Sequence, residues 1–377
     1  MSAVLVVVVV LLGAGCGEDS SPAARSPSPT QVLETPAPTP TNTPAPLRLD
    51  LGVSYDAVYF PFDITREKIE GDLDSLKQNG VNSIYVTTSE EDAADPTKID
   101  LILEAGHARG LRVYLNAYIG GTFSGDEGES ADQYLLQHPE DEMTSRLGAK
   151  SGLPTLNSQV YRAYLKDLLK TFLNRNFDGV LLDEPFFPQG SAEDYYPFDE
   201  ASQVKFNQMF GEAMPEVEND QVIRFRKIVM QEFLTELLDF IKGTRPEATT
   251  ILVVLPDFGG RDFIGTDDWR SLSRIDSLDV FQIDPYWYER DWEWFVANVD
   301  NLERETSGSK SLHGAWVQAY GMTGDYERIS QSLQYLKDQG IPWLAAWVTD
   351  VRPNDDMEAT WRAIAEVYLQ AGAQQTE

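Results

Sequence analysis

Residues 159–184 read QVYRAYLKDLLKTFLNRNFDGVLLDE, and this stretch decides the fold. In its first part, large side chains recur at the spacing of one helix face: Tyr161, Leu165, Leu168, Leu169 and Phe172. In its second part, an Asp-Gly turn precedes a short apolar run, 179–183, which is typical of a buried strand. The stretch therefore predicts a helix followed directly by a strand.

The same alternation of strand and helix continues on both sides of this stretch. Strands are predicted at residues 49–55, 83–88, 112–118, 179–183, 250–255, 280–284, 313–319 and 343–349. Gly80, Gly110 and Gly340 stand shortly before strands, at positions where glycine ends a helix. Eight strand–helix units of about 40 residues predict a (β/α)8 TIM barrel over residues 47–370. A doubly wound sheet is the alternative, but Gly52 alone does not supply its glycine-rich first turn.

Two segments are longer than a plain unit needs, 119–156 after the third strand and 185–222 after the fourth. Both follow strands on the side where a barrel builds its active site, so we interpret them as loops that cover substrate. Simple surface insertions are the alternative interpretation.

The amino-terminal residues differ in character from the rest of the chain. Residues 4–12 form an unbroken apolar run, short for a membrane span and typical of a secretion signal. The following Gly13-Ala14-Gly15-Cys16 resembles the lipobox of bacterial lipoproteins. That resemblance implies a signal peptide over 1–16, lipid on Cys16, and a protein held on the outer face of the cytoplasmic membrane or the cell surface. An ordinary signal peptide with an incidental cysteine is the alternative.

Between this signal and the barrel, residues 17–46 are rich in Pro, Ser and Thr. Proline pushes such a segment into an extended conformation, and it lacks the apolar residues of a core. We therefore expect a stalk there, and a polar tail at the other end of the chain, over residues 371–377.

The composition excludes several classes of function. The chain carries 61 acidic and 30 basic residues, a net charge of −31, so nucleic acid is not expected as a partner. One cysteine excludes a disulfide framework, and His107, His138 and His313 show no metal-ligand spacing. We expect a monomeric barrel that needs neither a metal nor another cofactor.

In a TIM barrel the catalytic residues lie at the carboxyl ends of the strands. Carboxylates, aromatics and amides dominate those positions here, without the lysine of a Schiff base or a nucleophilic hydroxyl with its base. Paired carboxylates can protonate a glycosidic oxygen and attack the sugar carbon or direct water at it. Aromatic faces can stack on sugar rings. The residues predicted to bind substrate are Tyr55, Asn116, Tyr118, Asp257, Gln282, Tyr286, Trp287, Trp316, Gln318, Trp347 and Asp350.

The strongest single motif is the DGxxxD pattern of the fourth strand, from Asp178 to Asp183. It resembles the fourth strand of (β/α)8-barrel glycoside hydrolases of the α-amylase-like, α-glucosidase-like and chitinase-like kinds. The resemblance implies that Asp178 is structural and that Asp183 faces the barrel mouth, where the first two kinds place their nucleophile. The chain departs from the chitinase-like pattern at Pro185, where those enzymes need a glutamate. Gln318 likewise stands where one group of retaining enzymes has a glutamate on strand 7.

The sixth strand offers a partner for Asp183. Alternation places Val280, Gln282 and Asp284 on one face, and its polar residues indicate that this face lines the barrel. One strand separates the fourth strand from the sixth, so Asp183 and Asp284 are predicted to form the catalytic pair across the mouth. α-Glucosidase-like enzymes also use these two strands. Glu184 is the alternative partner, provided that the strand ends before Pro185.

The sequence thus predicts a cell-surface glycoside hydrolase that cleaves O-glycosidic bonds of an oligo- or polysaccharide. Two alternatives remain. One is a non-catalytic carbohydrate-binding lipoprotein, in which no two carboxylates at the mouth come close together. The other is a Mg²⁺-dependent enzyme with Asn116, Asp183 and Asp257 as oxygen ligands.

Overall fold

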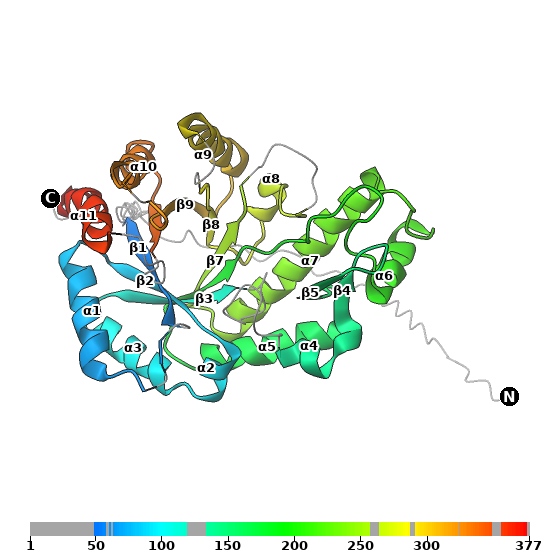
Figure 1. The fold of residues 1–377 in the computed structure, drawn as a ribbon, viewed down its shortest axis with the longest axis horizontal. Coiled ribbons are helices and arrows are strands. Elements are labelled where there is room, and N and C mark those ends of the chain that lie inside the picture. The colour runs from blue at the N-terminus through cyan, green and yellow to red at the C-terminus, as the bar shows by residue number, and fades with distance from the viewer. Residues whose placement is uncertain are drawn as a thin grey trace, which may run out of the picture. The chain divides into compact units, whose positions relative to one another are not determined.

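A computed structural model describes residues 49–57, 60–61, 63–118, 133–256, 264–286, 291–322, 324–348 and 356–374 (Figure 1). Eight parallel strands form a closed barrel in the order β1-β10-β9-β8-β7-β6-β3-β2. They are β1 (Asp50–Tyr55), β2 (Ser83–Thr87), β3 (Arg112–Tyr118), β6 (Gly179–Asp183), β7 (Thr249–Val254), β8 (Val280–Ile283), β9 (Leu312–Gln318) and β10 (Trp343–Trp347). Each overlaps a predicted strand, so the predicted (β/α)8 barrel is confirmed.

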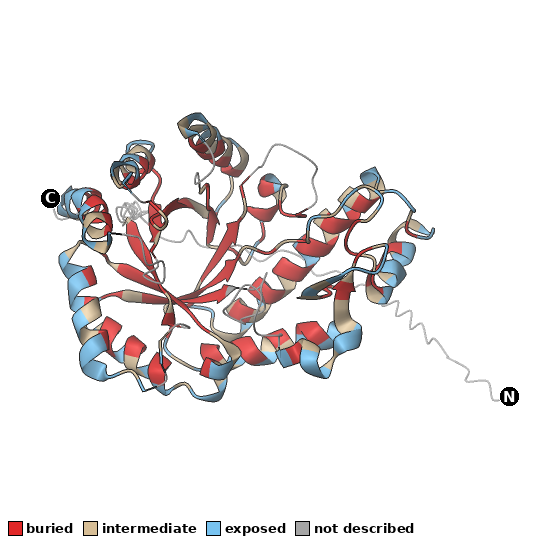
Figure 2. Ribbon diagram, in the orientation of Figure 1, coloured by how far each residue is buried: buried red, intermediate tan, exposed pale blue. Residues whose placement is uncertain are grey.

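Helices lie outside the ring of strands (Figure 1). The long ones are α1 (Arg66–Gln78), α3 (Thr97–Ala108), α5 (Gln159–Leu173), α6 (Glu200–Phe210), α7 (Asp220–Thr244), α9 (Trp292–Thr306), α10 (Glu327–Asp338) and α11 (Met357–Gln374). The short ones are α2 (Glu90–Ala94), α4 (Gln133–Gln137), α8 (Trp269–Leu272) and the 3-10 turn η2 (Pro139–Asp141). Figure 2 shows buried residues on the helix sides that face the strands. Because α11 buries Ala371 and runs to Gln374, the barrel extends beyond residue 370, where we expected a polar tail to begin.

The unit of α5 and β6 shows how the sequence builds the barrel. The Ser158 hydroxyl accepts a hydrogen bond from the Tyr161 N–H at 3.1 Å and so begins α5. All five large side chains of the predicted helix face are buried. Gly179 then begins β6. Only glycine fits there, because a side chain would overlap the carbonyl of Thr249 on the neighbouring strand β7.

Asp178, the first residue of the DGxxxD motif, has a structural role. Its carboxylate accepts a hydrogen bond from the Val113 N–H at 2.7 Å and lies 3.0 Å from His107 Nε2. These contacts join the start of β6 to β3 and α3, as the resemblance implied for this aspartate.

The inward faces of the strands form their own apolar cluster inside the barrel. Its buried members are Tyr85, Tyr114, Leu181, Ile251, Val253, Val280, Trp316, Trp343 and Ala345. At the amino end of the strands this cluster meets the buried Asp50, whose carboxylate lies 2.9 Å from Arg112 Nη2. The hydroxyls of Tyr85 and Tyr114 donate to it at 3.3 Å. Burial raises the pKa of Asp50, and the charge of Arg112 opposes that rise.

The ring closes between the first strand and the last. β1 and β10 pair in parallel. The Ser54 hydroxyl donates to the carbonyl of Val348 at 2.6 Å, and the Tyr368 hydroxyl of α11 donates to the carbonyl of Gly52 at 2.8 Å. Side-chain hydrogen bonds therefore reinforce the seam between the two ends of the barrel.

The two long segments pack against each other. In the first, β4 (Glu142–Thr144) and β5 (Lys150–Pro154) form an antiparallel hairpin that the sequence analysis did not predict. The Arg146 N–H donates to the carbonyl of Tyr195 at 3.0 Å, and the Phe198 N–H donates to the carbonyl of Thr144 at 2.7 Å. Hydrogen bonds thus connect the described parts of the two segments. Whether these segments cover bound substrate, as the sequence analysis expects, stays a prediction.

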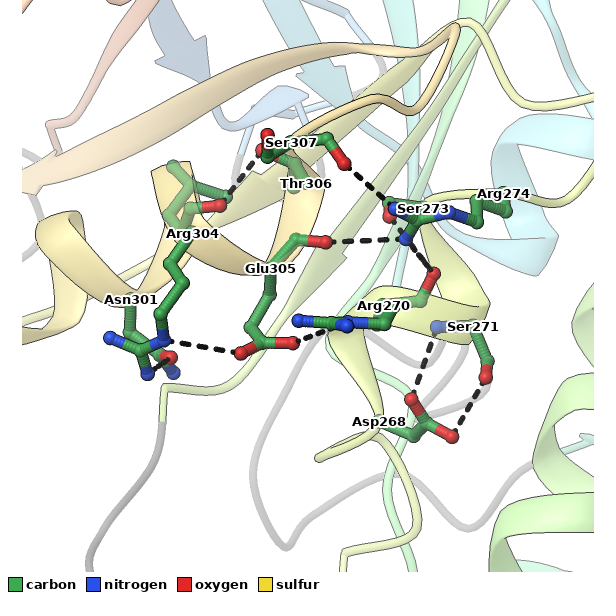
Figure 3. A network of polar contacts seen from close by, with 11 residues as sticks. Asp268, Arg270, Ser271, Ser273, Arg274, Asn301, Arg304, Glu305, Thr306 and Ser307 are labelled. Atoms are coloured by element: carbon green, nitrogen blue, oxygen red, sulfur yellow. Dashed lines mark hydrogen bonds and ion pairs between the residues drawn. The ribbon is translucent and has the colours of Figure 1, made fainter.

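A polar network fixes the connection that leads into β8 (Figure 3). Arg274 donates to the carbonyl of Ser307 at 2.7 Å and to that of Glu305 at 3.3 Å. Arg270 Nε lies 3.1 Å from the Glu305 carboxylate. The last carbonyls of a helix lack partners within it, so those at the end of α9 are free to accept from Arg274. The contacts of Arg270 and Arg274 therefore hold α8 against the carboxyl end of α9.

In the part of the chain that the structure describes, no helix is long and apolar enough to cross a membrane. The predicted signal peptide, Cys16 and stalk lie outside the described residues. Their assignment stays a prediction from the sequence.

Candidate active site

Asp183 and Asp284 lie at the carboxyl end of the barrel, on its inner face. Asp183 is the last residue of β6, two positions after Leu181 of the inner cluster. Asp284 directly follows β8, whose Val280 belongs to the same cluster. The two side chains are 6% and 2% exposed, respectively. The structure thus brings the predicted pair to one place, although more deeply buried than we expected.

Glu184 breaks the alternation of β6. Its φ is +41°, and no other non-glycine residue of the described ranges has a positive φ. A side chain in this region is strained by roughly 1–2 kcal/mol, and such strain is typical of functional sites. The Glu184 N–H still donates to the carbonyl of Val253 on β7 at 3.1 Å. The turn brings the partly exposed Glu184 carboxyl close enough to Asp284 to raise the pKa of that buried group.

The environment of Asp284 favours its protonated form. Burial raises its pKa most strongly, and the charge of Glu184, its hydrogen bond with Glu184 and the charge of Asp183 raise it further. No N–H or O–H group of another described residue donates to either oxygen of Asp284. Two neighbouring carboxyl groups favour a proton on one of them, because two like charges repel. The more buried Asp284 is the group that holds it.

The surroundings of Asp183 also raise its pKa well above the usual range, although one hydrogen-bond donor opposes the rise. Burial and the charge of Glu184 raise its pKa, and the charge of Asp56 adds a smaller rise. A hydrogen bond from Asn116 acts in the opposite direction. This donor distinguishes Asp183 from Asp284 and favours its ionised form.

Asn116 donates to the Asp183 carboxylate and does not lie on an open binding surface. It is fully buried, and its Nδ2 donates to the Thr87 hydroxyl oxygen at 3.1 Å. The Thr87 hydroxyl in turn donates to Asp56 at 3.0 Å. The prediction that Asn116 binds substrate is therefore revised to a contact with Asp183.

Tyr286 lies beside the carboxyl groups. Its N–H donates to the carbonyl of Asp284 at 2.6 Å, which makes a tight turn after β8. Burial raises the pKa of its hydroxyl, and the charges of Asp284 and Glu184 add to that rise. The hydroxyl therefore stays a neutral hydrogen-bond donor. Its ring contacts Tyr320 edge-on, with 5.9 Å between the ring centres.

The predicted aromatic and amide ligands of strands β8 to β10 divide by depth. Trp316 is 1% exposed, and its Nε1 donates to Gln282 Oε1 at 3.1 Å, so both belong to the core and cannot stack on sugar or contact it. Gln318 is also buried, and its Nε2 donates to the carbonyl of Tyr320 at 3.1 Å. Trp347 is partly exposed above Trp316, with 5.6 Å between the ring centres. Trp347 is thus the member of this group that can meet a ligand.

The prediction that Tyr55 binds substrate is wrong. The phase of β1 turns its ring away from the barrel interior, against Phe60, with 5.0 Å between the ring centres. Its hydroxyl lies 3.5 Å from Asp72 of α1. Asp257, Trp287 and Asp350 lie outside the described residues, as does the side chain of Tyr118.

Two residues near the carboxylates were not predicted. Thr87 continues the inward alternation of Ser83 and Tyr85 along β2, and that pattern could have identified it. Tyr320 follows β9 in a bend, where strand alternation no longer applies. The described ranges contain no group of three or more His, Cys, Asp or Glu side chains arranged to hold a metal ion. One proposed Mg²⁺ ligand, Asp257, is outside those ranges.

No protein-family model matches the chain, and no curated protein resembles it in sequence. Solved structures resemble its fold. A β-galactosidase from Marinomonas ef1 is 12% identical, with a TM-score of 0.65 over 86% of this chain and 60% of that one. An endo-β-1,4-mannanase from Thermotoga petrophila is 9% identical, with a TM-score of 0.58 over 87% of this chain and 78% of that one. The β-amylase catalytic domain of Paenibacillus polymyxa is 12% identical, with a TM-score of 0.58 over 85% and 99%.

The chain spans about three fifths of the length of the β-galactosidases that it matches. At these identities the likeness shows that the chain has the same barrel fold. Its function has to be argued from its own residues.

Proposed function

We propose that this protein hydrolyses O-glycosidic bonds of an oligo- or polysaccharide. The observation that carries the proposal is the cluster of Asp183, Glu184 and Asp284 from two non-adjacent strands at the carboxyl end of the barrel. Glycoside hydrolysis needs a carboxylic acid that protonates the leaving oxygen and a carboxylate that attacks the sugar carbon or activates water. Burial and neighbouring charges raise the pKa of Asp284, and such a carboxyl can hold a proton at neutral pH.

We assign the roles by exposure and hydrogen bonding. Glu184 is the partly exposed member, so it passes the proton to the glycosidic oxygen as the bond from that oxygen to the sugar carbon breaks. Asp284 shares this proton with Glu184 and holds it while the site is empty. Asp183, to which Asn116 donates, remains a carboxylate and attacks the sugar carbon or takes a proton from water.

Two further observations support the carbohydrate class. Trp347 and Tyr286 offer partly exposed aromatic surface near the carboxyls. The solved proteins that share the fold include a β-galactosidase, a mannanase and a β-amylase. Because β9 carries Gln318, the acid and the attacking carboxylate are assigned to Glu184 and Asp183 at the end of β6, and Asp284 after β8 shares the proton.

The test is hydrolysis of a glycan panel and of aryl glycosides by the full chain and by Glu184→Gln, Asp183→Asn and Asp284→Asn. On the glycans we expect losses of about 10²–10⁴-fold in kcat/KM for each variant. Glu184→Gln should keep most of its activity on aryl glycosides with good leaving groups, because these need no proton. The control Glu193→Gln changes an exposed carboxyl of the segment after β6 and should act like the parent.

Parent-like hydrolysis by all three variants would contradict the assigned site. Binding of a glycan by the parent without any cleavage would instead support the non-catalytic alternative.

We further propose that the protein works at the cell surface, held by lipid on Cys16. The apolar run over residues 4–12 and the small residues before Cys16 support this location. Cys16→Ser should release the protein from the membrane fraction. If Cys16→Ser still pellets with membranes, the apolar run itself holds the protein there.

A further inference from the structure

We infer that Asp56, Thr87 and Asn116 form a positioning chain that aims the carboxylate of Asp183. The inference rests on the proposed function, because there Asp183 acts as base or nucleophile. Asp56 follows β1, Thr87 ends β2 and Asn116 lies on β3. These strands are neighbours, and β3 pairs with β6, which carries Asp183. The chain therefore crosses four adjacent strands at one level of the barrel.

Hydrogen-bonding capacity fixes the direction of this chain. The Asp56 carboxylate can only accept, and the Thr87 hydroxyl donates to it at 3.0 Å. A threonine hydroxyl has one proton, so the Thr87 oxygen must accept from Asn116 Nδ2, at 3.1 Å. The amino group of Asn116 then faces both Thr87 and Asp183 and can donate one N–H to each.

Burial makes the orientation of the Asn116 amide matter for the charge of Asp183. Thr87 is 8% exposed and Asn116 is fully buried, so bulk water does not replace a lost partner. Asn116 Oδ1 has no hydrogen-bond partner in the described structure. If the amide were reversed, this oxygen would face the Asp183 carboxylate and repel it. Thr87 prevents the reversal, because it requires a donor from Asn116.

The remaining ionisable groups around Asp183 are Glu184 directly after β6, Asp56 after β1, and Asp284 and Tyr286 after β8, and none of them is basic. The charges of Glu184 and Asp56 raise the pKa of Asp183, and the hydrogen bond from Asn116 lowers it. Loss of its donor should therefore make Asp183 harder to ionise, whereas loss of the Asp56 charge should make it easier.

The test compares variants that change one link at a time. Thr87→Val keeps the shape of the side chain and removes the hydroxyl. We expect it to move the acidic limb of kcat/KM to higher pH by about 1 unit and to lower kcat/KM roughly tenfold, as expected for a weakened hydrogen bond to a charged group. Asp56→Asn keeps an acceptor and removes the charge, so the limb should move to lower pH. Thr87→Ser should restore the parent profile.

A readout independent of activity separates this inference from the proposed function. The carboxyl ¹³C resonance of Asp183, assigned by its absence in Asp183→Asn, should titrate with the same opposed shifts. The control Thr88→Val removes a buried hydroxyl that has no partner and should titrate like the parent. If the titrations shift but no glycoside is cleaved, the proposed function fails and the positioning chain stands.

Parent-like titration of Thr87→Val, or failure of Thr87→Ser to restore the parent profile, would overturn the inference. Should Thr87→Val not fold, Asp56→Asn and Thr87→Ser still decide the matter. An Asp56→Asn titration that stays in place or moves to higher pH would also overturn it.

Discussion

The carboxyl groups of Glu184 and Asp284 interact although β7 lies between the strands that carry them. The contact depends on the positive φ of Glu184, which turns the side chain from the outer face of β6 toward Asp284. Two carboxyl groups in such contact cannot both be ionised, so the site carries a proton at pH values where free carboxylic acids have lost theirs.

The buried carboxyl of Asp284 should destabilise the fold at neutral pH. Its pKa is raised in the folded state, so its contribution to stability is full below the unfolded value of about 3.9 and is lost as pH rises through the folded value. Asp284→Asn removes this penalty and should be more stable than the parent at pH 8 by about 1–3 kcal/mol. Urea unfolding at pH 4 and pH 8 measures this. A gain that was larger at pH 4 would contradict the account.

The strained backbone at Glu184 gives a second prediction. Glycine adopts a φ of +41° without strain, whereas alanine retains the Cβ. Glu184→Gly should therefore exceed Glu184→Ala in stability by roughly 1 kcal/mol, although both lack the carboxyl group. At an ordinary strand position alanine would be the more stable residue. The melting temperatures of the two variants decide between these cases.

Trp347 should contribute to binding more than to chemistry. Its ring is partly exposed, and Trp347→Ala removes a stacking surface without touching the carboxyls. We expect KM to rise roughly 2- to 12-fold with kcat nearly unchanged, as an aromatic contact of about 0.5–1.5 kcal/mol implies. Trp316→Phe, which leaves Gln282 without its donor, should instead lower the melting temperature. A fall in kcat alone for Trp347→Ala would argue against a binding role.

Asp50 should matter for stability and not for activity. Asp50→Ala leaves Arg112 without its buried partner and removes the acceptor of Tyr85 and Tyr114. We expect a loss of about 3–5 kcal/mol, with parent-like activity per folded molecule. Asp50→Asn keeps an acceptor and should lose less. An Asp50→Ala protein as stable as the parent would show that this network contributes little.

Much of the fold could be predicted because it depends on periodicity. The short apolar runs locate all eight barrel strands, and the apolar face over residues 161–172 locates α5. Alternation also identified the inner face of Asp284, since a regular strand preserves the phase of its side chains. The inner position of Asp183 was instead implied by the resemblance of its DGxxxD motif. Asp178 and Gly179 marked the start of β6, because an Asp-Gly turn signal depends only on adjacent residues.

The errors lie where the strands end. Tyr55 is the last residue of β1, and the position of a residue at a strand end does not reveal which face it occupies. The depth of Trp316 depends on the side chains stacked above it, which no local pattern contains. The orientation of Glu184 depends on one unusual dihedral angle, imposed by its surroundings.

The seam between β1 and β10 has a consequence for how the protein is made. The strands that carry Asp183 and Asp284 leave the ribosome well before Trp343–Trp347, yet the ring that holds them opposite each other closes only when β10 pairs with β1. Until then the sheet has open edges, and the carboxyl end of the barrel, where the site lies, is incomplete. Synthesis therefore yields an inactive polypeptide until β10 has been made, and no fragment of the barrel that lacks β10 should acquire the activity.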